Sequence, residues 1–149
     1  MSDLIKIYNG SVIAGATDGD EVSMEGFSNP VQFTLNAAKD EEGVAKLAIR
    51  CKSGYKTYGN TKNSAYHLNG TKYEATGGEV EKWFFAKYNG YANANDAKEN
   101  ATWANSLTIS DVITDTNTIF WVKATSNSAE APQNDEDESI HVETVVEAV

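Results

Sequence analysis

Hydrophobic and polar residues follow a strand-like pattern in residues 107–123, which read LTISDVITDTNTIFWVK. The first part alternates apolar residues with Thr and Ser, a polar turn follows at residues 115–117, and the second part contains the apolar run 119–122. Short polar side chains bond to the local backbone in turns, and a short apolar run bounded by turn residues is typical of a strand buried on both faces. The pattern therefore predicts two strands joined by a corner, with residues 118–124 as a central strand and Trp121 as its main core residue.

Similar alternation predicts the other strands, which span residues 3–8, 31–36, 45–51, 79–88 and 139–146. The second and third of these each have one apolar and one polar face, so we expect them to pair as an antiparallel hairpin. Cys51 completes the apolar face of residues 45–51 and is expected to be a small core residue, not a reactive thiol. The further core candidates are Phe33, Leu47, Trp83 and Ile119.

Long polar stretches separate these strands. Residues 11–28 are mostly small, acidic or Gly and predict a loop, with at most one short strand at residues 11–14. The Tyr-rich stretch 55–76 predicts one or two short strands or a long excursion, and the polar stretch 89–105 predicts a helical turn around residues 95–101. Because the strands are short and no convincing amphipathic helix is present, we expect an all-β fold, an antiparallel sandwich of about seven or eight strands.

Chain length and charge limit the number of domains and the classes of partner that we expect. A length of 149 residues suits one domain, so we expect residues 1–149 to form a single domain whose acidic C-terminal segment, 125–149, includes the last strand. That segment has seven acidic residues and no Lys or Arg, and the whole chain has a net charge of −10. This balance argues against nucleic acid and anionic membrane surfaces as partners, and the acidic segment would suit a basic neighbour.

The single cysteine and the N-terminal sequence indicate the cellular compartment in which the chain folds. Cys51 has no second cysteine with which to form a disulfide, and no CxxC motif is present. The start of the sequence, MSDLIKIYNG, lacks the basic and apolar regions of a secretory signal, and no stretch approaches the roughly 20 apolar residues that span a bilayer. We expect a soluble product that folds in the cytoplasm where it is made.

Residues that could carry catalysis or bind a metal are sparse. The two histidines, His67 and His141, are far apart in the sequence, and the GxSxG, HExxH, phosphate-binding and dinucleotide-binding motifs are absent. Only the abundance of acidic residues speaks for a hydrolase with a carboxylate pair. The acidic clusters at residues 18–21 and 135–138 lack the spacing of an EF-hand loop, and we interpret them as solvated turns. We therefore expect no enzymatic activity, no cofactor and no metal site.

The middle of the chain is rich in aromatic residues. Six of the seven tyrosines lie in residues 53–101, interleaved with Gly, Asn and Thr. Tyr and Trp beside amides are typical of surfaces on which sugar rings stack, and exposed Tyr also suits a protein contact. The interpretation that we favour is that residues 83–85 are core and that the tyrosines cover a hairpin. A sugar-binding surface would use Tyr55, Tyr58, Tyr66, Tyr73, Trp83 and Tyr91.

The order of motifs along the chain resembles a known family. The strand LIKIY, then NPVQFTLNA, KLAIRC, a Gly- and Thr-rich middle that leads to KWFFA, then WANSLTISDVI, NTIFWVKA, PQND and a last short strand are similar to the small Ig-like domains of bacteriophage virion proteins from Gram-positive bacteria. The resemblance is strongest in residues 103–124 and 132–142, and residues 55–78 depart from it. It implies an antiparallel Ig-like β-sandwich with a long aromatic-rich insertion.

The resemblance also implies a structural role in the virion. We expect a non-enzymatic protein, made in the bacterial host cytoplasm, that decorates the outer surface of the capsid. The alternatives are a neck or tail accessory protein and a carbohydrate-binding module that uses the Tyr-rich middle. The expected partner is the major capsid protein or another virion protein, and a homo-oligomer and a surface glycan remain open as partners.

The contacts of such a protein are expected in its loops and at its acidic end. An acidic end without a partner would be disordered, so we expect the last strand or tail to pair with a neighbour or with an edge of its own sheet. The expected contact residues are Asp3, Lys6, Tyr55, Tyr58, Asp135, Glu136, Asp137 and Glu138.

Overall fold

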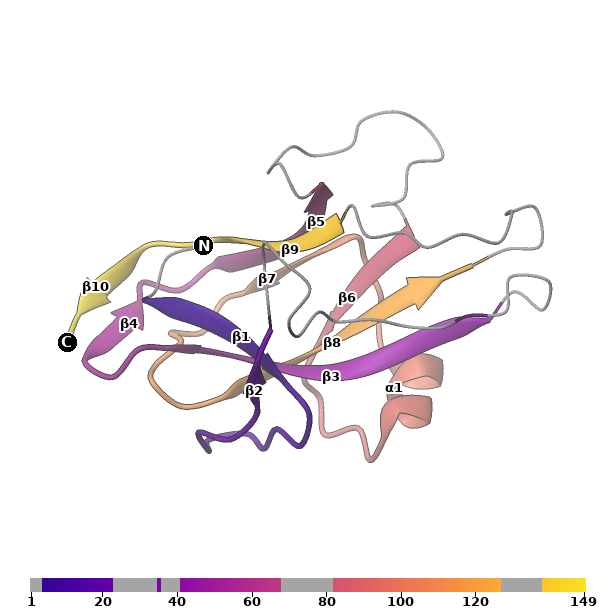
Figure 1. Ribbon diagram of the computed structural model, residues 1–149, viewed down its shortest axis with the longest axis horizontal. Helices are drawn as coiled ribbons and strands as arrows, with labels where there is room; N and C mark the ends of the chain where they lie inside the picture. Colours follow the sequence, from indigo (N-terminus) through magenta and orange to yellow (C-terminus); the bar gives the residue numbers. More distant parts are fainter. Residues whose placement is uncertain (1–3, 23–34, 36–40, 68–81, 127–137) are drawn as a thin grey trace.

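The chain forms an all-β fold of antiparallel sheets, as the alternation predicts (Figure 1). The computed structural model describes residues 4–22, 35, 41–67, 82–126 and 138–149. Within these ranges it has ten strands and one short helix, α1 (Ala94–Asn100). The strands are β1 (Ile5–Asn9), β2 (Asp20–Glu21), β3 (Glu42–Cys51), β4 (Tyr55–Thr57), β5 (Thr61–His67), β6 (Trp83–Lys87), β7 (Ser106–Ile109), β8 (Thr118–Thr125), β9 (Glu138–Glu143) and β10 (Val146–Ala148).

The largest sheet has five strands in the order β2-β1-β3-β8-β6. β3 pairs with β1 through residues 48–51 and with β8 through residues 42–49. Because β8 lies between β3 and β6, the prediction of a central strand at residues 118–124 is confirmed. The corner at residues 110–117 joins β8 to β7, which lies in another sheet, so these two strands are neighbours in sequence but not in hydrogen bonding.

Two continuous segments of the chain each contribute one strand to both of the smaller sheets. β4 pairs with β10, and β5 lies between β7 and β9. β4 leads into β5 through Gly59 and Asn60, whose φ angles are 103° and 53°, and β9 leads into β10 through residues 144–145. At this kink the hydroxyl oxygens of Thr61 and Thr144 lie 2.8 Å apart and share a hydrogen bond. The C-terminal segment was predicted to pair either with a neighbour or with an edge of its own sheet; the structure shows pairing within the chain, through two strands, β9 and β10.

Replacement of Gly59 with alanine is expected to lower the free energy of unfolding by about 1–3 kcal/mol. A Cβ atom there would lie 2.8 Å from the carbonyl oxygen of Ser110, in addition to the unfavourable positive φ. Gly54 is a matched control, because its φ is also positive at 90° but a Cβ atom would meet nothing within 4 Å. Urea unfolding of both variants separates the two effects, and equal losses would contradict the close approach at Gly59.

The main core joins the five-stranded sheet to the two smaller sheets. Alternate residues of a strand point to opposite faces, so Leu47, Ile49 and Cys51 enter this core from β3, as predicted, and Phe120 and Val122 enter it from β8. Burial raises the pKa of the Cys51 thiol, and the negative charge of Asp115 adds to this effect, which agrees with a core role. The other buried members are Ile5, Ile7, Val22, Phe85, Ile109, Ile113 and Ile140.

The structure corrects the predicted place of Trp121. Its side chain is only 2% exposed, but it lies on the face of β8 opposite Phe120 and Val122. There it packs with Ala86 and Ala97 in a second cluster, which α1 helps to cover. The apolar run at residues 119–122 predicted two buried faces of β8 correctly, but it could not show which face carries the larger core.

Local hydrogen bonds explain why the helix begins where it does. The Asn93 side chain accepts a hydrogen bond from the Asp96 N–H at 2.9 Å, and the Asp96 carboxylate accepts one from the Ala92 N–H at 2.9 Å. The first of these bonds satisfies an N–H group of the first turn that has no partner within the helix, and the second fixes the residue before the N-cap. The bond from Ala92, followed by that from Asn100, lowers the pKa of Asp96 below its ordinary value. The predicted helical turn around residues 95–101 is confirmed.

The structure differs in what it shows for the remaining predicted elements, which are residues 31–36, residues 11–14 and the Tyr-rich stretch. Apart from Leu35, the predicted strand at residues 31–36 lies outside the described residues, and with it the core candidate Phe33 and the partner that was predicted to form a hairpin with residues 45–51. Residues 11–14 do not form a strand; they belong to the loop between β1 and β2. The Tyr-rich stretch contains the short strands β4 and β5 as far as residue 67, so this part is integral to the sheets.

Candidate functional site

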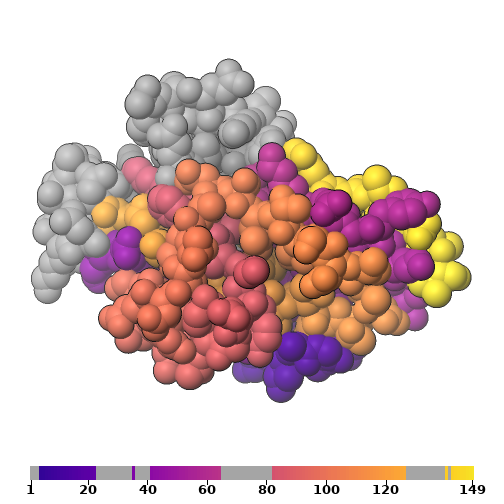
Figure 2. Space-filling model, turned by 180° about the vertical axis from the view of Figure 1, so that it is seen from behind, coloured from indigo at the N-terminus to yellow at the C-terminus, as the bar shows by residue number. Residues whose placement is uncertain are grey.

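Three parts of the chain that are distant in sequence are linked by hydrogen bonds. They are the loop at residues 10–19, the corner at residues 110–117, and the ribbon of residues 54–58 and 145–149 around β4 and β10. We call these three parts the linked segments. Figure 2 shows them next to one another, with the loop in indigo, the corner in light orange and the ribbon in purple and yellow.

The links are short and specific. Thr57 of the ribbon donates its N–H to the carbonyl oxygen of Ile113 at 2.9 Å, and its hydroxyl accepts a hydrogen bond from the Ile113 N–H at 2.8 Å. Asn117, at the end of the corner, accepts a backbone hydrogen bond from Gly15 at 3.0 Å and donates one to Ala16 at 2.8 Å. The corner is therefore fixed to the ribbon at one end and to the loop at the other.

The linked segments carry most of the large exposed apolar side chains among the described residues. Five of the six large apolar side chains that are exposed among the described residues belong to them. The sixth, Tyr88, follows β6 and is outside them. Exposed apolar patches on soluble proteins mark contacts with partners. The five are Ile13, Tyr58, Val112, Val145 and Val149.

The outer face of the ribbon combines apolar and charged groups. Lys56 lies opposite Glu147 with an Nζ–Oε1 distance of 3.7 Å. Next to this pair Tyr58, which is 68% exposed, donates its N–H to the Val145 carbonyl oxygen at 3.1 Å. A hydrogen bond from the Tyr58 hydroxyl to the Glu147 carboxylate, together with the charge of that carboxylate, raises the pKa of Tyr58. The exposed ring is thus held over the ribbon by its polar end.

A partly buried polar network holds the loop against the sheet. The Asn117 amide nitrogen donates to the Ile13 carbonyl oxygen at 3.1 Å and to Asp18 Oδ1 at 2.8 Å. The Arg50 guanidinium donates to the Asn117 amide oxygen at 2.7 Å and to the Asp18 carbonyl oxygen at 2.8 Å. It also lies 3.5 Å from the centroid of the Tyr8 ring, in the geometry of a cation–π contact. The loop is therefore fixed by side chains of β1, β3 and the corner.

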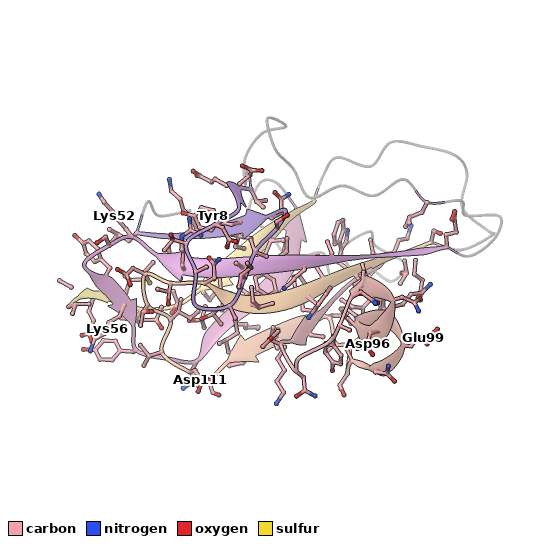
Figure 3. The ribbon with its side chains drawn as sticks, turned by 90° about the horizontal axis from the view of Figure 1, so that it is seen from below. Tyr8, Lys52, Lys56, Asp96, Glu99 and Asp111 are labelled. Carbon is pink, nitrogen blue, oxygen red and sulfur yellow. The ribbon has the colours of Figure 1, made fainter. Side chains whose placement is uncertain are left out.

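The charges on the loop and the corner are mostly negative. Asp20, the first residue of β2 after the loop, is an exposed carboxylate, and so are Asp111 and Asp115 of the corner. The nearby Arg50 is bonded within the network, and Lys6 forms an ion pair with Glu21 at 3.1 Å. Figure 3 shows Asp111 toward the same end as Lys52 and Lys56, and Asp96 and Glu99 on α1 toward the other.

The structure brings together only some of the predicted contact residues. Tyr55 and Tyr58 both belong to the linked segments, but Tyr55 packs against the main core, whereas Tyr58 is exposed. Lys6 lies outside the linked segments and is paired with Glu21. Glu138 begins β9, and its side chain is not described. Asp3, Asp135, Glu136 and Asp137 lie outside the described residues.

The aromatic residues proposed for sugar binding do not form one surface in the described part of the chain. Tyr55 and Trp83 pack against the main core. Tyr91 contacts Trp121 edge-to-face, with 6.3 Å between the ring centroids. The Tyr66 side chain and the whole of Tyr73 are not described. Of this set, Tyr58 is the one that the structure shows as exposed.

No metal-binding cluster is found in the described ranges. There, no three His, Cys, Asp or Glu side chains come together as metal ligands. Asp18 of the first acidic cluster serves the loop, because its Oδ1 accepts hydrogen bonds from Ile13 and Asn117. The same ranges contain no helix with the length and apolar character needed to span a membrane. The second acidic cluster falls outside them, apart from Glu138.

Sequence reasoning missed most of the exposed apolar residues. Ile13 stands in a stretch that reads as a polar loop, and Val112 stands beside the buried Ile113 in a corner. The available signal was the unusual position of Ile13, a β-branched residue among small and acidic neighbours. Val145 and Val149 lie on the same face of the strand as Glu147, because alternate residues share a face and Val146 packs against the main core from the opposite face. Their exposure therefore follows from strand pairing and not from composition.

Comparisons with protein-family models, with curated proteins and with solved structures found no match for this chain. The function is therefore argued from the residues of the chain and their arrangement.

Proposed function

We propose that this chain is a non-enzymatic structural protein of a bacteriophage virion and that it decorates the outer surface of the capsid. The observation that carries the proposal is the grouping of Ile13, Tyr58, Val112, Val145 and Val149 on the linked segments. An exposed apolar surface of this kind suits a contact with another protein. The choice of a virion protein as the partner rests on the resemblance of the motif order to virion Ig-like domains.

The rest of the molecule supports a binding role. A capsid offers many equivalent sites, so a modest affinity for each copy is sufficient. The net charge of −10 favours solubility at high copy number, and the linked segments are fixed by hydrogen bonds before any partner arrives. A surface that needs little reordering loses less conformational entropy on binding.

The first test is the copy number in the particle. This chain is quantified against the major capsid protein in gradient-purified particles from its source. A ratio on the order of one copy per capsomer or per capsid subunit supports decoration. A handful of copies would reassign the protein to the neck or tail, and its absence would overturn the virion role.

A matched pair of tyrosine variants tests the contact surface. Tyr58→Ser is expected to lower the affinity for particles that lack the chain by about tenfold, because exposed Tyr residues are frequent binding hot spots. Tyr88→Ser is the control, since Tyr88 is also exposed but lies outside the linked segments. Sedimentation of labelled protein with the particles measures both affinities. Equal binding by the two variants would exclude Tyr58 from the contact.

A further inference from the structure

We propose that the Asn89–Gly90 pair is a site of spontaneous covalent modification, at which the side-chain amide of Asn89 is lost as ammonia and the main chain rearranges to isoaspartate. The inference goes beyond the proposed function and does not depend on it. It concerns the connection between β6 and α1, which lies outside the linked segments. The reactants are the chain itself and water.

The reaction uses the amide of an asparagine and the main-chain nitrogen of the next residue. The Gly90 nitrogen attacks Cγ of Asn89, so that an N–Cγ bond forms, the Cγ–Nδ2 bond breaks, and ammonia leaves with the proton of the Gly90 N–H. Water then opens the cyclic imide. Attack of water at Cγ gives aspartate, and attack at the main-chain carbonyl carbon gives isoaspartate. Because glycine has no Cβ atom, its nitrogen can approach the asparagine side chain closely.

The structure leaves this pair open to the reaction. Asn89 and Gly90 are exposed and belong to no strand or helix. Among the described residues, neither the Asn89 side chain nor the Gly90 N–H has a hydrogen-bond partner. The φ angle of Gly90 is 69°, and a Cβ atom added there would meet nothing within 4 Å, so the surrounding space is open. No paired backbone therefore has to separate before the Gly90 nitrogen turns toward Cγ of Asn89.

A second Asn–Gly pair in the chain provides the comparison. Asn9 is the last residue of β1, is half-buried and pairs with Asp20 of β2. Reaction at Asn9 therefore requires opening of this strand pairing, whereas reaction at Asn89 requires no such opening. The third pair, Asn69–Gly70, lies outside the described residues. Since Asn9 and Asn89 are each followed by glycine, the fold and not the local sequence separates their reactivity.

The rearranged main chain would disturb the cluster that α1 covers. Both products add a negative charge, but only isoaspartate lengthens the main chain, because the chain then runs through the former side-chain carbons. Tyr91 directly follows Gly90, and its ring contacts Trp121 edge-to-face, with 6.3 Å between the ring centroids. Asn93, the N-cap of α1, lies two residues further along. A longer main chain immediately before them is expected to weaken the ring contact and the start of α1.

Peptide mapping by mass spectrometry tests the site, with the full chain incubated at mildly alkaline pH in water that carries a heavy oxygen isotope. In the folded protein, heavy oxygen should enter residue 89 about tenfold or more faster than residue 9. In the urea-unfolded chain the two rates should be nearly equal. Gly90→Ala should slow the labelling of residue 89, because a methyl group hinders the approach of the nitrogen. Equal rates at Asn9 and Asn89 in the folded protein, or an unchanged rate in Gly90→Ala, would overturn the inference.

A comparison of unfolding temperatures tests the effect of the longer main chain. The isoaspartate form is separated from the unmodified protein by anion exchange, and Asn89→Asp is the matched control, since it has the same charge and an ordinary main chain. The isoaspartate form is expected to unfold about 2–4 °C below Asn89→Asp. Equal unfolding temperatures would overturn the expected effect on Tyr91 and α1, whereas the labelling experiment decides the site itself.

Discussion

Replacement of Trp121 with alanine is expected to lower the free energy of unfolding by about 3–5 kcal/mol. The side chain is 2% exposed and packs between the sheet and α1, in contact with Ala86 and Ala97. Its removal would leave a cavity that small alanine neighbours cannot fill, and it would also remove the edge-to-face contact with Tyr91. Urea unfolding followed by circular dichroism measures the loss.

Trp121→Phe is the informative control for this variant. It keeps an aromatic ring beneath α1 and removes the indole N–H, for which the described residues supply no hydrogen-bond acceptor. The loss of stability should therefore be clearly smaller than for alanine. A loss below about 1 kcal/mol for Trp121→Ala would contradict the burial of this side chain beneath α1.

Asn117→Ala is expected to lower the free energy of unfolding by about 2–4 kcal/mol, because several partly buried hydrogen bonds are lost together. The side chain is 5% exposed and joins Ile13, Asp18 and Arg50. In the alanine variant, the loop at residues 10–19 loses the hydrogen bonds that the Asn117 amide donates to it. The Arg50 guanidinium also loses one acceptor.

An asparagine elsewhere in the chain provides the comparison for Asn117. Asn105 is exposed, and its amide donates to the carbonyl oxygen of Trp83 at 3.1 Å. Asn105→Ala should cost less than about 1 kcal/mol, since water can replace an exposed partner. Chemical unfolding of both variants under the same conditions tests the difference. Equal losses would show that the network around Asn117 adds nothing beyond an ordinary surface hydrogen bond.

Much of the larger sheet could be predicted because its strands alternate strongly. Leu47, Ile49 and Cys51 occupy every second position of β3 and all enter the main core, as expected. Trp83 and Phe85 likewise face this core from β6. These positions follow directly from the period of two residues in a strand, so the sequence was sufficient for them.

The smaller sheets were harder to predict because several of their buried residues are polar. Thr57 and Thr61 are almost fully buried, and their hydroxyls bond to Ile113 and Thr144, which lie far away in sequence. When the hydrogen-bond partner of a buried polar residue is far away in sequence, the local sequence does not indicate that the residue is buried. For the same reason the loop containing Ile13 could not be recognised as rigid, since Asn117, which fixes it, is contributed by the corner.

The pairing of β4 with β10 and of β5 with β9 has a consequence for synthesis on the ribosome. Residues 55–67 leave the ribosome long before residues 138–148, with which they pair. Until then β4 lacks its strand partner and β5 lacks one of its two neighbours, and unpaired strand edges invite aggregation and proteolysis. A chain released before β9 would remain incomplete in both smaller sheets. Proteolysis should therefore remove chains that lack β9 and β10 in preference to chains that carry them.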